Sequence, residues 1–446
     1  MDTRKPNTQL DRLHKEAGWT QGQFAREVNR LGTERGTPTT FGESTVHYWR
    51  KGVTPKEEVR PLIMEALSRR LGRPITHTEA GFPPSGGEPA IHASLTEGII
   101  DLGSQDMSPS RRAIVNAGLF SVALTVPNWP DIIGRMERIQ KDSTPRIGMS
   151  EVHMVVSMTE RISELDDQFG GRHARPMAAA FLVNTVAPYL RADGSGSVRK
   201  AMMSAASDLC YLTGYMAVDE GAHGLAQQYY LKALQLAGAS EDHSTYCTTL
   251  RGMSVQAVDL GHGRTAMRLA DAASAASPQA GPRMRAFLAG QQAHAAAQIG
   301  DRGNSFKYLR EAEIAMERAE SRSKPFGSYD PSSLNYHVSQ VRYELGDIAG
   351  SISAMQESDQ LRYSTYRRAR VRHRATLAER QLEIGHLEVA CKTWNLALDD
   401  YPLVQSGRAD QKIMSMFRVI RPHLNNQTAR ALYERARTVT PAALHS

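Results

Sequence analysis

The sequence predicts an all-α protein in which a small N-terminal helical domain is followed by a long C-terminal α-solenoid. Alternating β-branched runs are rare in its 446 residues, and Asn-Gly hairpin signals are absent. Five glycines recur at intervals of 40, 39, 46 and 39 residues, with small residues at fixed offsets around each. A Pro-, Gly- and Ser-rich stretch separates this repetitive part from a compact, basic N-terminal region.

These features divide the chain into four parts. We expect a first domain over residues 1–82, an exposed linker over 83–109, a connecting helix over 110–140 and a repeat domain over 141–446. An apolar run at 113–126 follows two arginines, as in an export signal. It is too short to span a bilayer and begins far into the chain, so we expect a buried helix there.

Two apolar helical patterns frame the N-terminal domain. Thr20 is placed to cap a helix whose apolar face carries Phe24 and Val28. Residues 56–71 form a later helix that supplies Leu62 to the same core. This region is also the most basic part of the chain. Residues 1–82 hold 14 Lys and Arg against 10 Asp and Glu, which is +4 of the total +7. A basic module of this kind fits double-stranded DNA as its partner.

Between these helices, a short helix begins near residues 43–44 and buries only Val46 and Trp49. A narrow buried seam with an exposed polar and basic face is typical of helices that enter the major groove. With one glutamine from the preceding helix, the residues that we expect to contact DNA are Gln21, Ser44, Thr45, His47, Tyr48, Arg50 and Lys51. The alternative is a purely structural helical bundle whose basic side chains are simply solvated.

The N-terminal pattern resembles the phage-repressor (XRE) class of helix-turn-helix domains. The matching elements are Gly18-x-Thr20-Gln21-x-x-Phe24-Ala25, then Ser44-Thr45-Val46-x-x-Trp49-x-x-Gly52, then Pro55. The resemblance implies that Gln21 contacts a backbone phosphate, and that the exposed residues of the second element face base edges. The two elements are further apart than is usual in this class. We expect the extra residues, about 30–41, to form a polar, glycine-rich loop that reaches a phosphate or the minor groove.

The C-terminal repeats are defined by small residues around turn glycines. Positions seven before, five after and twelve after each glycine are Gly, Ala or Ser in all five repeats, whose glycines are Gly221, Gly261, Gly300, Gly346 and Gly385. Small residues let helices approach closely, and glycine permits a tight turn, so each unit is expected to be an antiparallel helix pair. The pattern resembles the tetratricopeptide repeat over about 206–400, although its tryptophan and most aromatic positions are missing. Residues 149–192 resemble one more pair, and 409–437 a degenerate cap.

The resemblance to tetratricopeptide superhelices implies a concave face lined by the first helix of each pair. The residues expected there are Tyr211, Tyr215, Arg251, His294, Tyr336, Gln340 and Arg372. Tyrosines beside arginine and glutamine suit a peptide or a polar small molecule, whereas the alternative is an ordinary polar inner surface. A further charge run at 367–374 could bind the DNA backbone, an acidic partner, or the nearby Glu379 and Glu383. The alternative is a solvated or ion-paired helix.

Three phrases resemble regulators of filamentous, sporulating actinobacteria that join an elongated helix-turn-helix to a divergent tetratricopeptide domain. They read ALSRRLGRPIT (66–76), GGRHARP (170–176) and GAHGLAQQYY (221–230). The resemblance implies a sequence-specific transcription regulator of differentiation or antibiotic production, acting as a repressor and gated through its repeats by a ligand, peptide or partner. We expect a homodimer, because single helix-turn-helix modules bind weakly. The alternatives are an interaction scaffold without DNA binding and a peptide-pheromone sensor.

No catalytic, metal or cofactor motif stands out, so we expect no enzyme activity, no cofactor and no metal. The three cysteines are far apart and lack C-x-x-C spacing, which favours a reducing compartment over a disulfide framework. The polar N-terminus argues against a secretory signal, and we expect a cytoplasmic protein without a membrane partner.

Overall fold

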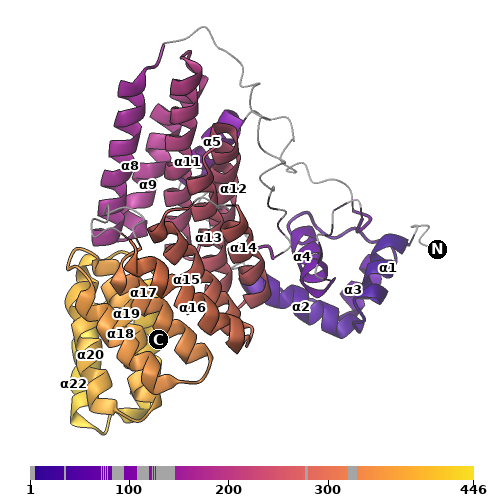
Figure 1. Ribbon diagram of the computed structural model, residues 1–446. Coiled ribbons are helices and arrows are strands. Elements are labelled where there is room, and N and C mark those ends of the chain that lie inside the picture. Colours follow the sequence, from indigo (N-terminus) through magenta and orange to yellow (C-terminus); the bar gives the residue numbers. More distant parts are fainter. Residues whose placement is uncertain are drawn as a thin grey trace.

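The protein is helical throughout the part of the chain that the computed structural model describes (Figure 1). Apart from one isolated bridge between Arg146 and Asp193, these residues form no β-structure, which confirms the predicted all-α class. None of the helices in this part combines the length and apolar character that a membrane crossing requires. The described residues are 6–34, 37–71, 73, 75, 77, 79–82, 95–107, 120–122, 124, 126, 146–276, 280–319 and 329–445.

The N-terminal bundle consists of α1 (Thr8–Glu16), α2 (Gln21–Glu34), α3 (Glu43–Arg50) and α4 (Arg60–Leu71). Thr20 caps α2 as the sequence predicts. Its hydroxyl accepts from the backbone N–H of Gln23 (3.2 Å), and the Gln23 side chain accepts from the N–H of Thr20 (2.8 Å). The core is one cluster that includes the predicted apolar residues Phe24, Val28, Val46, Trp49 and Leu62, together with Ala25, Val59, Ile63, Ala66 and Leu67.

The connection between α2 and α3 is more ordered than predicted. The expected polar loop over about 30–41 is wrong at its start, because α2 continues through Arg30 and Gly32 to Glu34. The Asn29 side chain then holds the returning chain: its amide donates to the carbonyl of Phe41 (2.9 Å) and its oxygen accepts from the Phe41 N–H (2.7 Å). The entry of α3 is thus fixed to the body of α2.

The expected exposed linker over 83–109 is wrong in its second half, where α5 (Leu95–Met107) is a packed helix. Its Ile99 and Leu102 are buried in the main core of the repeat domain. Asp106 at its end forms an ion pair with Arg175 and accepts from the hydroxyl of Tyr229 (3.0 Å). The apolar pair Ile99 and Leu102 and the buried carboxylate of Asp106 therefore hold α5 against the repeat domain, although the sequence before it is rich in glycine.

The apolar run at 113–126 and the connecting segment 110–140 lie mostly outside the described residues. Where residues of this run are described, at 120–122, 124 and 126, they are not helical, so the predicted helix is wrong there. The physical reason is that the backbone N–H groups of Ser121 and Val122 bond to side chains of other helices instead of to a helical ladder. The run is nevertheless docked, since Phe120 is buried and Val122 and Leu124 pack against the main core.

Five antiparallel helix pairs follow one another as predicted. In each pair the predicted glycine stands in the turn, with φ between +76° and +85°, a left-handed conformation that favours glycine. The pairs are α11 (Gly196–Asp219) with α12 (His223–Ser240), α13 (His243–Asp259) with α14 (Gly263–Ala275), α15 (Pro282–Gln298) with α16 (Arg302–Glu317), α17 (Pro331–Glu344) with α18 (Ile348–Leu361), and α19 (Arg367–Glu383) with α20 (Leu387–Asp400).

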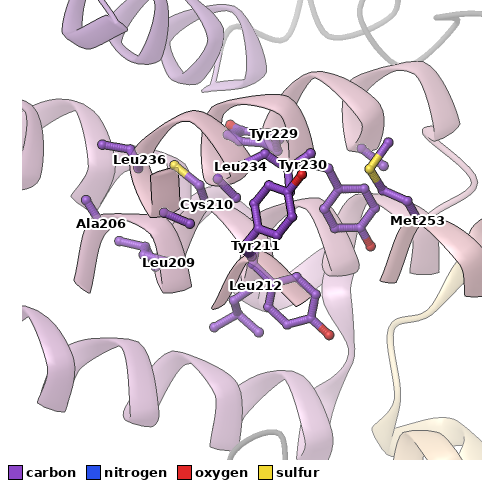
Figure 2. Packing of buried hydrophobic residues seen from close by; sticks show 14 of the residues in the cluster. Ala206, Leu209, Cys210, Tyr211, Leu212, Tyr229, Tyr230, Leu234, Leu236 and Met253 are labelled. Carbon is purple, nitrogen blue, oxygen red and sulfur yellow. The ribbon is translucent and has the colours of Figure 1, made fainter. Parts of the chain in front are cut away.

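The small residues mark where the two helices of a pair touch. Every alanine and serine at the three fixed offsets is fully buried. At two of these positions a serine hydroxyl donates across the contact: Ser254 to the carbonyl of Ala266 (2.8 Å), and Ser339 to that of Ser351 (2.7 Å). In the first pair, the neighbouring core residues include Cys210, Tyr230 and other side chains shown in Figure 2.

Helices at both ends complete the array. Before it stand α8 (Met149–Phe169), α9 (Gly171–Phe181), a π-helical turn (Leu182–Val186) and α10 (Ala187–Arg191), so the expected extra pair is present and broken near Gly170. After it come the 3₁₀ turn Tyr401–Leu403, α21 (Gly407–Ile420), the turn Arg421–His423, α22 (Gln427–Val439) and the turn Ala442–Leu444.

The two ends of the array meet. The backbone N–H of Gln405 donates to the carbonyl of Phe169 (2.6 Å), and the Gln405 carbonyl accepts from the N–H of Arg172 (3.2 Å). A side chain at Gly170 would place its Cβ 2.3 Å from the Gln405 carbonyl oxygen, so only glycine fits this junction. The curved array of helix pairs is closed by this contact.

Candidate nucleic-acid interface

Helix α3 presents its polar face to solvent in the full chain. Ser44, His47 and Lys51 are exposed, Tyr48 is 59% exposed, and Thr45 is half-buried. In Figure 1, α1 and α3 lie on the side of the N-terminal bundle that faces away from the repeat helices. No part of the described chain therefore covers these outer side chains of α3.

Local chemistry explains why this short helix is held rigidly. Trp49 is buried and meets Phe41 edge-on at 5.1 Å between ring centres. The helix ends at Lys51 and Gly52, whose φ is +98°. The N–H of Val53 then bonds back to the carbonyl of Tyr48 (2.9 Å). A helix anchored at its seam and at both ends can present its outer side chains in one fixed register.

Gln21 and Arg50 meet between α2 and α3, but Arg50 is tied to α1. With its amide oriented to satisfy both neighbours, Gln21 donates to the Glu43 carbonyl (3.1 Å) and accepts from Arg50 Nη1 (2.9 Å). Arg50 also forms an ion pair with Asp11, whose pKa is lowered by hydrogen bonds from Lys15 and Arg50. Arg50 thus positions α3 against α1, a role that the sequence pattern did not signal.

A short segment connects α4 of the bundle to the repeats; we call Phe120, Ser121 and Val122 the strap. Glu65 of α4 is buried and accepts from the Ser121 hydroxyl (2.7 Å) and the Val122 N–H (2.9 Å). On the other side, the amide of Gln227 in α12 bonds to both the N–H and the carbonyl of Ser121, each at 2.9 Å.

Two further contacts fix the strap. Arg69 of α4 donates to the carbonyl of Phe120 (2.6 Å) while it pairs with Glu34 (2.7 Å) and Glu65 (2.8 Å). The ring of Phe120 stacks on His262 with 5.1 Å between centres and only 3° between planes. Burial and nearby Arg69 lower the pKa of His262 to about 4. The neutral imidazole can therefore stack at neutral pH without a buried charge.

The first helices of the pairs enclose a cavity of about 210 Å³. Of the seven residues expected on the concave face, six line it: Tyr211, Tyr215, Arg251, His294, Tyr336 and Arg372. Gln340 does not, because its side chain accepts from Arg380, which also donates to Ser339 (2.6 Å) and Ser351 (2.7 Å) inside its own layer. Sequence reasoning missed other lining residues from distant segments, among them Asp166, Tyr329, Arg362, Arg368 and Arg408.

The charge run at 367–374 is used inside the fold. Arg368 pairs with Asp166 (2.9 Å) and Asp167 (3.2 Å) of α8, and Arg374 pairs with Asp359 (3.0 Å). The pairing with Glu379 and Glu383, one of the possibilities that the sequence left open, is not found, because Glu379 pairs with Lys412 and Glu383 accepts from Tyr343 (3.0 Å). The ion-paired alternative is therefore the correct one for these arginines.

Comparison with known families agrees with the N-terminal part of this description. The family described as the SP15 N-terminal domain matches residues 10–83, which span α1 to α4. No curated protein matches the chain. The match covers less than half of the chain and leaves the helical repeats unassigned. The match supports an N-terminal domain of DNA-binding-like type, whereas the solenoid-like array of helix pairs is a finding of the structure alone.

Proposed function

We propose that the protein is a sequence-specific DNA-binding transcription regulator, and that its repeat domain gates the DNA-binding bundle. The observation that carries this proposal is the exposed polar face of α3, on which His47, Tyr48 and Lys51 are open to solvent. The bundle contacts the strap through Glu65 of α4, so this contact leaves the face of α3 open. A helix of this kind reads base edges with its outer side chains, while its basic ends contact phosphates.

The proposal includes the finer expectations from the sequence. The DNA-bound form is a homodimer, because one small bundle makes few base contacts and two half-sites multiply its affinity. The protein acts in the cytoplasm, as a repressor of differentiation or secondary metabolism, in line with the actinobacterial regulators that it resembles. The strap supplies a route for gating, since it touches α4 on one side and the repeat helices on the other.

The test begins with genome-wide mapping of bound DNA in the native host, followed by titration of the purified full-length protein on the recovered sites. Tyr48→Ala and His47→Ala should each reduce the difference in binding free energy between the specific site and a site with altered bases by roughly 1–3 kcal/mol. The reason is that contacts to base edges distinguish one sequence from another. Lys51→Gln should weaken binding to all sequences alike and reduce the slope of log K against log salt by about one.

Arg310→Gln is the matched control, because Arg310 is an exposed arginine of the repeat domain far from α3 in the sequence. It should leave affinity and salt slope unchanged. If Tyr48→Ala and Lys51→Gln leave occupancy in the host and affinity in solution as in the unaltered protein, the DNA-binding proposal fails. The chain would then act as an interaction scaffold.

A further inference from the structure

The cavity of the repeat domain draws on every helix pair of the array. Its walls include Tyr211 of α11, Arg251 of α13, His294 of α15, Tyr336 of α17 and Arg372 of α19. Further walls come from the connections before α17 and α19, and from α8 and the start of α21. The last two segments approach each other at the junction near Gln405. A ligand in this space would touch all five pairs and both closing segments at once.

The cavity holds more guanidinium groups than its carboxylates neutralise. Five arginines line it. Arg368 is paired with Asp166 and Asp167, and Arg408 is paired with Asp259. The other lining carboxylate, Asp330, caps α17 by accepting from the N–H of Ser333 (2.7 Å). Of these five arginines, Arg251, Arg362 and Arg372 form no direct ion pair with a carboxylate of the described residues. The charges of Asp330 and Asp359 act on Arg362 and partly oppose the lowering of its pKa by burial.

Several polar atoms of the lining residues are buried without a hydrogen-bond partner among the described residues. They are Nε of Arg251, Nε of Arg362, Nη1 of Arg408, Nε2 of His294, Nδ1 of His373, Oδ1 of Asp166 and Oε1 of Gln291. A buried polar group without a partner destabilises the fold, so a ligand that supplies acceptors to the buried donors recovers that loss on binding. Three of these atoms are guanidinium donors, which pair best with carboxylate or phosphate oxygens, whereas Asp166 and Gln291 contribute one acceptor each.

Flat side chains form the rest of the wall. The Arg251 guanidinium lies 4.1 Å from the ring centre of Phe287, and Tyr336 stacks on His373 with 4.3 Å between ring centres. Tyr211, Tyr215 and Tyr329 add further rings. Such surfaces favour planar groups that stack in an offset or edge-on manner. The volume of about 210 Å³ is smaller than the roughly 300–1,000 Å³ of pockets for drug-sized ligands, which favours a molecule of metabolite size.

We propose that this cavity binds a small organic anion that combines a planar ring with a carboxylate or phosphate group. Its acid group lies against Arg251, Arg362 and Arg372, and its ring lies among the tyrosines. This inference deepens the proposed function by naming the class of ligand that gates the regulator. Binding to the cavity is measured without DNA, so the two proposals can fail separately.

The experiment compares four probes on the purified full-length protein by thermal unfolding and calorimetric titration. Benzoate and phenyl phosphate carry a ring and an anion, benzamide is the neutral counterpart of benzoate, and inorganic phosphate is an anion without a ring. At saturating concentration, benzoate or phenyl phosphate should raise Tm by roughly 2–5 °C. Whichever of these two probes binds more tightly shows whether the cavity prefers a carboxylate or a phosphate. Benzamide and inorganic phosphate should bind at least about tenfold more weakly than their counterparts.

Arg251→Gln should lower the affinity for the tighter-binding probe by roughly tenfold or more. Arg251→Lys, which keeps the charge, should retain part of this affinity. The exposed Arg310→Gln serves as the matched control and should bind as the unaltered protein does. Unfolding of each variant without probe shows whether a loss reflects the fold.

Three results would overturn the inference: no probe binds, benzamide binds as well as benzoate, or a folded Arg251→Gln protein retains full affinity. Equal affinity for inorganic phosphate and phenyl phosphate would show that the ring does not contribute to binding, and would overturn that part of the proposal. A Tyr48→Ala protein that loses DNA but still binds the probe would leave the cavity assignment intact.

Discussion

Individual buried histidines make the free energy of unfolding of this protein depend on pH. Burial lowers the pKa of His294 to about 4, helped by the charges of Arg380 and Arg251 and opposed by Asp259. His337 and His373 are shifted in the same direction, first by burial and then by nearby arginines. In an unfolded chain, histidine titrates near pH ~6.5. Between that pH and about 4, the unfolded state binds a proton that folded His294 does not bind, so stability falls as the solution is acidified.

Replacing His294 by glutamine should reduce this dependence. We expect the loss of unfolding free energy between pH 7 and pH 5 to be smaller by roughly 1–2 kcal/mol in His294→Gln than in the unaltered protein. Urea unfolding at the two pH values measures it. His153→Gln, which changes an exposed histidine of α8, should retain the full dependence. If the pH dependence of the unfolding free energy were the same in His294→Gln, the pKa of His294 would not be lowered in the folded protein.

At the scale of helices, the spacing of small residues sets how closely two helices of a pair approach. Gly214 of α11 illustrates the limit, because a Cβ there would lie 2.9 Å from the ring of Tyr230 and 3.2 Å from the Ala226 carbonyl. The neighbours belong to α12 and include backbone, so they cannot move aside as the tip of a flexible side chain would.

Gly214→Ala should therefore destabilise the repeat domain by roughly 1–3 kcal/mol, although alanine favours helix more than glycine does. Gly196→Ala is the matched control. Gly196 begins the same helix and has nothing within 4 Å of the position of a Cβ, so alanine there should be neutral or slightly stabilising. Chemical unfolding of both variants checks the pair. Equal stability of the two would mean that the helix contact is looser than its geometry shows.

At the scale of the whole molecule, the strap couples two units that have separate hydrophobic cores. The core of the bundle and the main core of the repeats share no residues. Glu65 is the central link, since it is buried and accepts from Arg69, Ser121 and Val122. Among the described residues, the coupling therefore rests on a few charged hydrogen bonds and the stacked ring of Phe120.

Glu65→Gln should weaken the link by roughly 2–3 kcal/mol, because an amide replaces one carboxylate oxygen and offers donors where acceptors are needed. In calorimetry we expect the bundle to melt in a separate transition at lower temperature. Glu57→Gln, a change at an exposed glutamate just before α4, should keep the melting profile of the unaltered protein. If the Glu65 variant also kept that profile, the strap would not couple the two units.

The sequence alone determined those parts of the fold that rest on local periodicity. The turn glycines, the small residues at fixed offsets, the cap at Thr20 and the buried seam of α3 each depend on neighbours within one or two helices, so their spacing reveals them. The concave face was predictable only through the resemblance to tetratricopeptide superhelices, which implies that the first helix of each pair lines it. The exposure of α3 also matches its pattern, whereas its contact with DNA remains a prediction.

Tertiary structure decided the contacts between residues that are far apart along the chain. Arg368 meets Asp166 and Asp167 about two hundred residues away, and Gln405 closes the array against Phe169. α5 and the strap are shaped in the same way, since their partners lie on distant helices. The curvature of the array determines which side chains meet, and curvature accumulates from many small packing angles. No local pattern in the sequence records that sum.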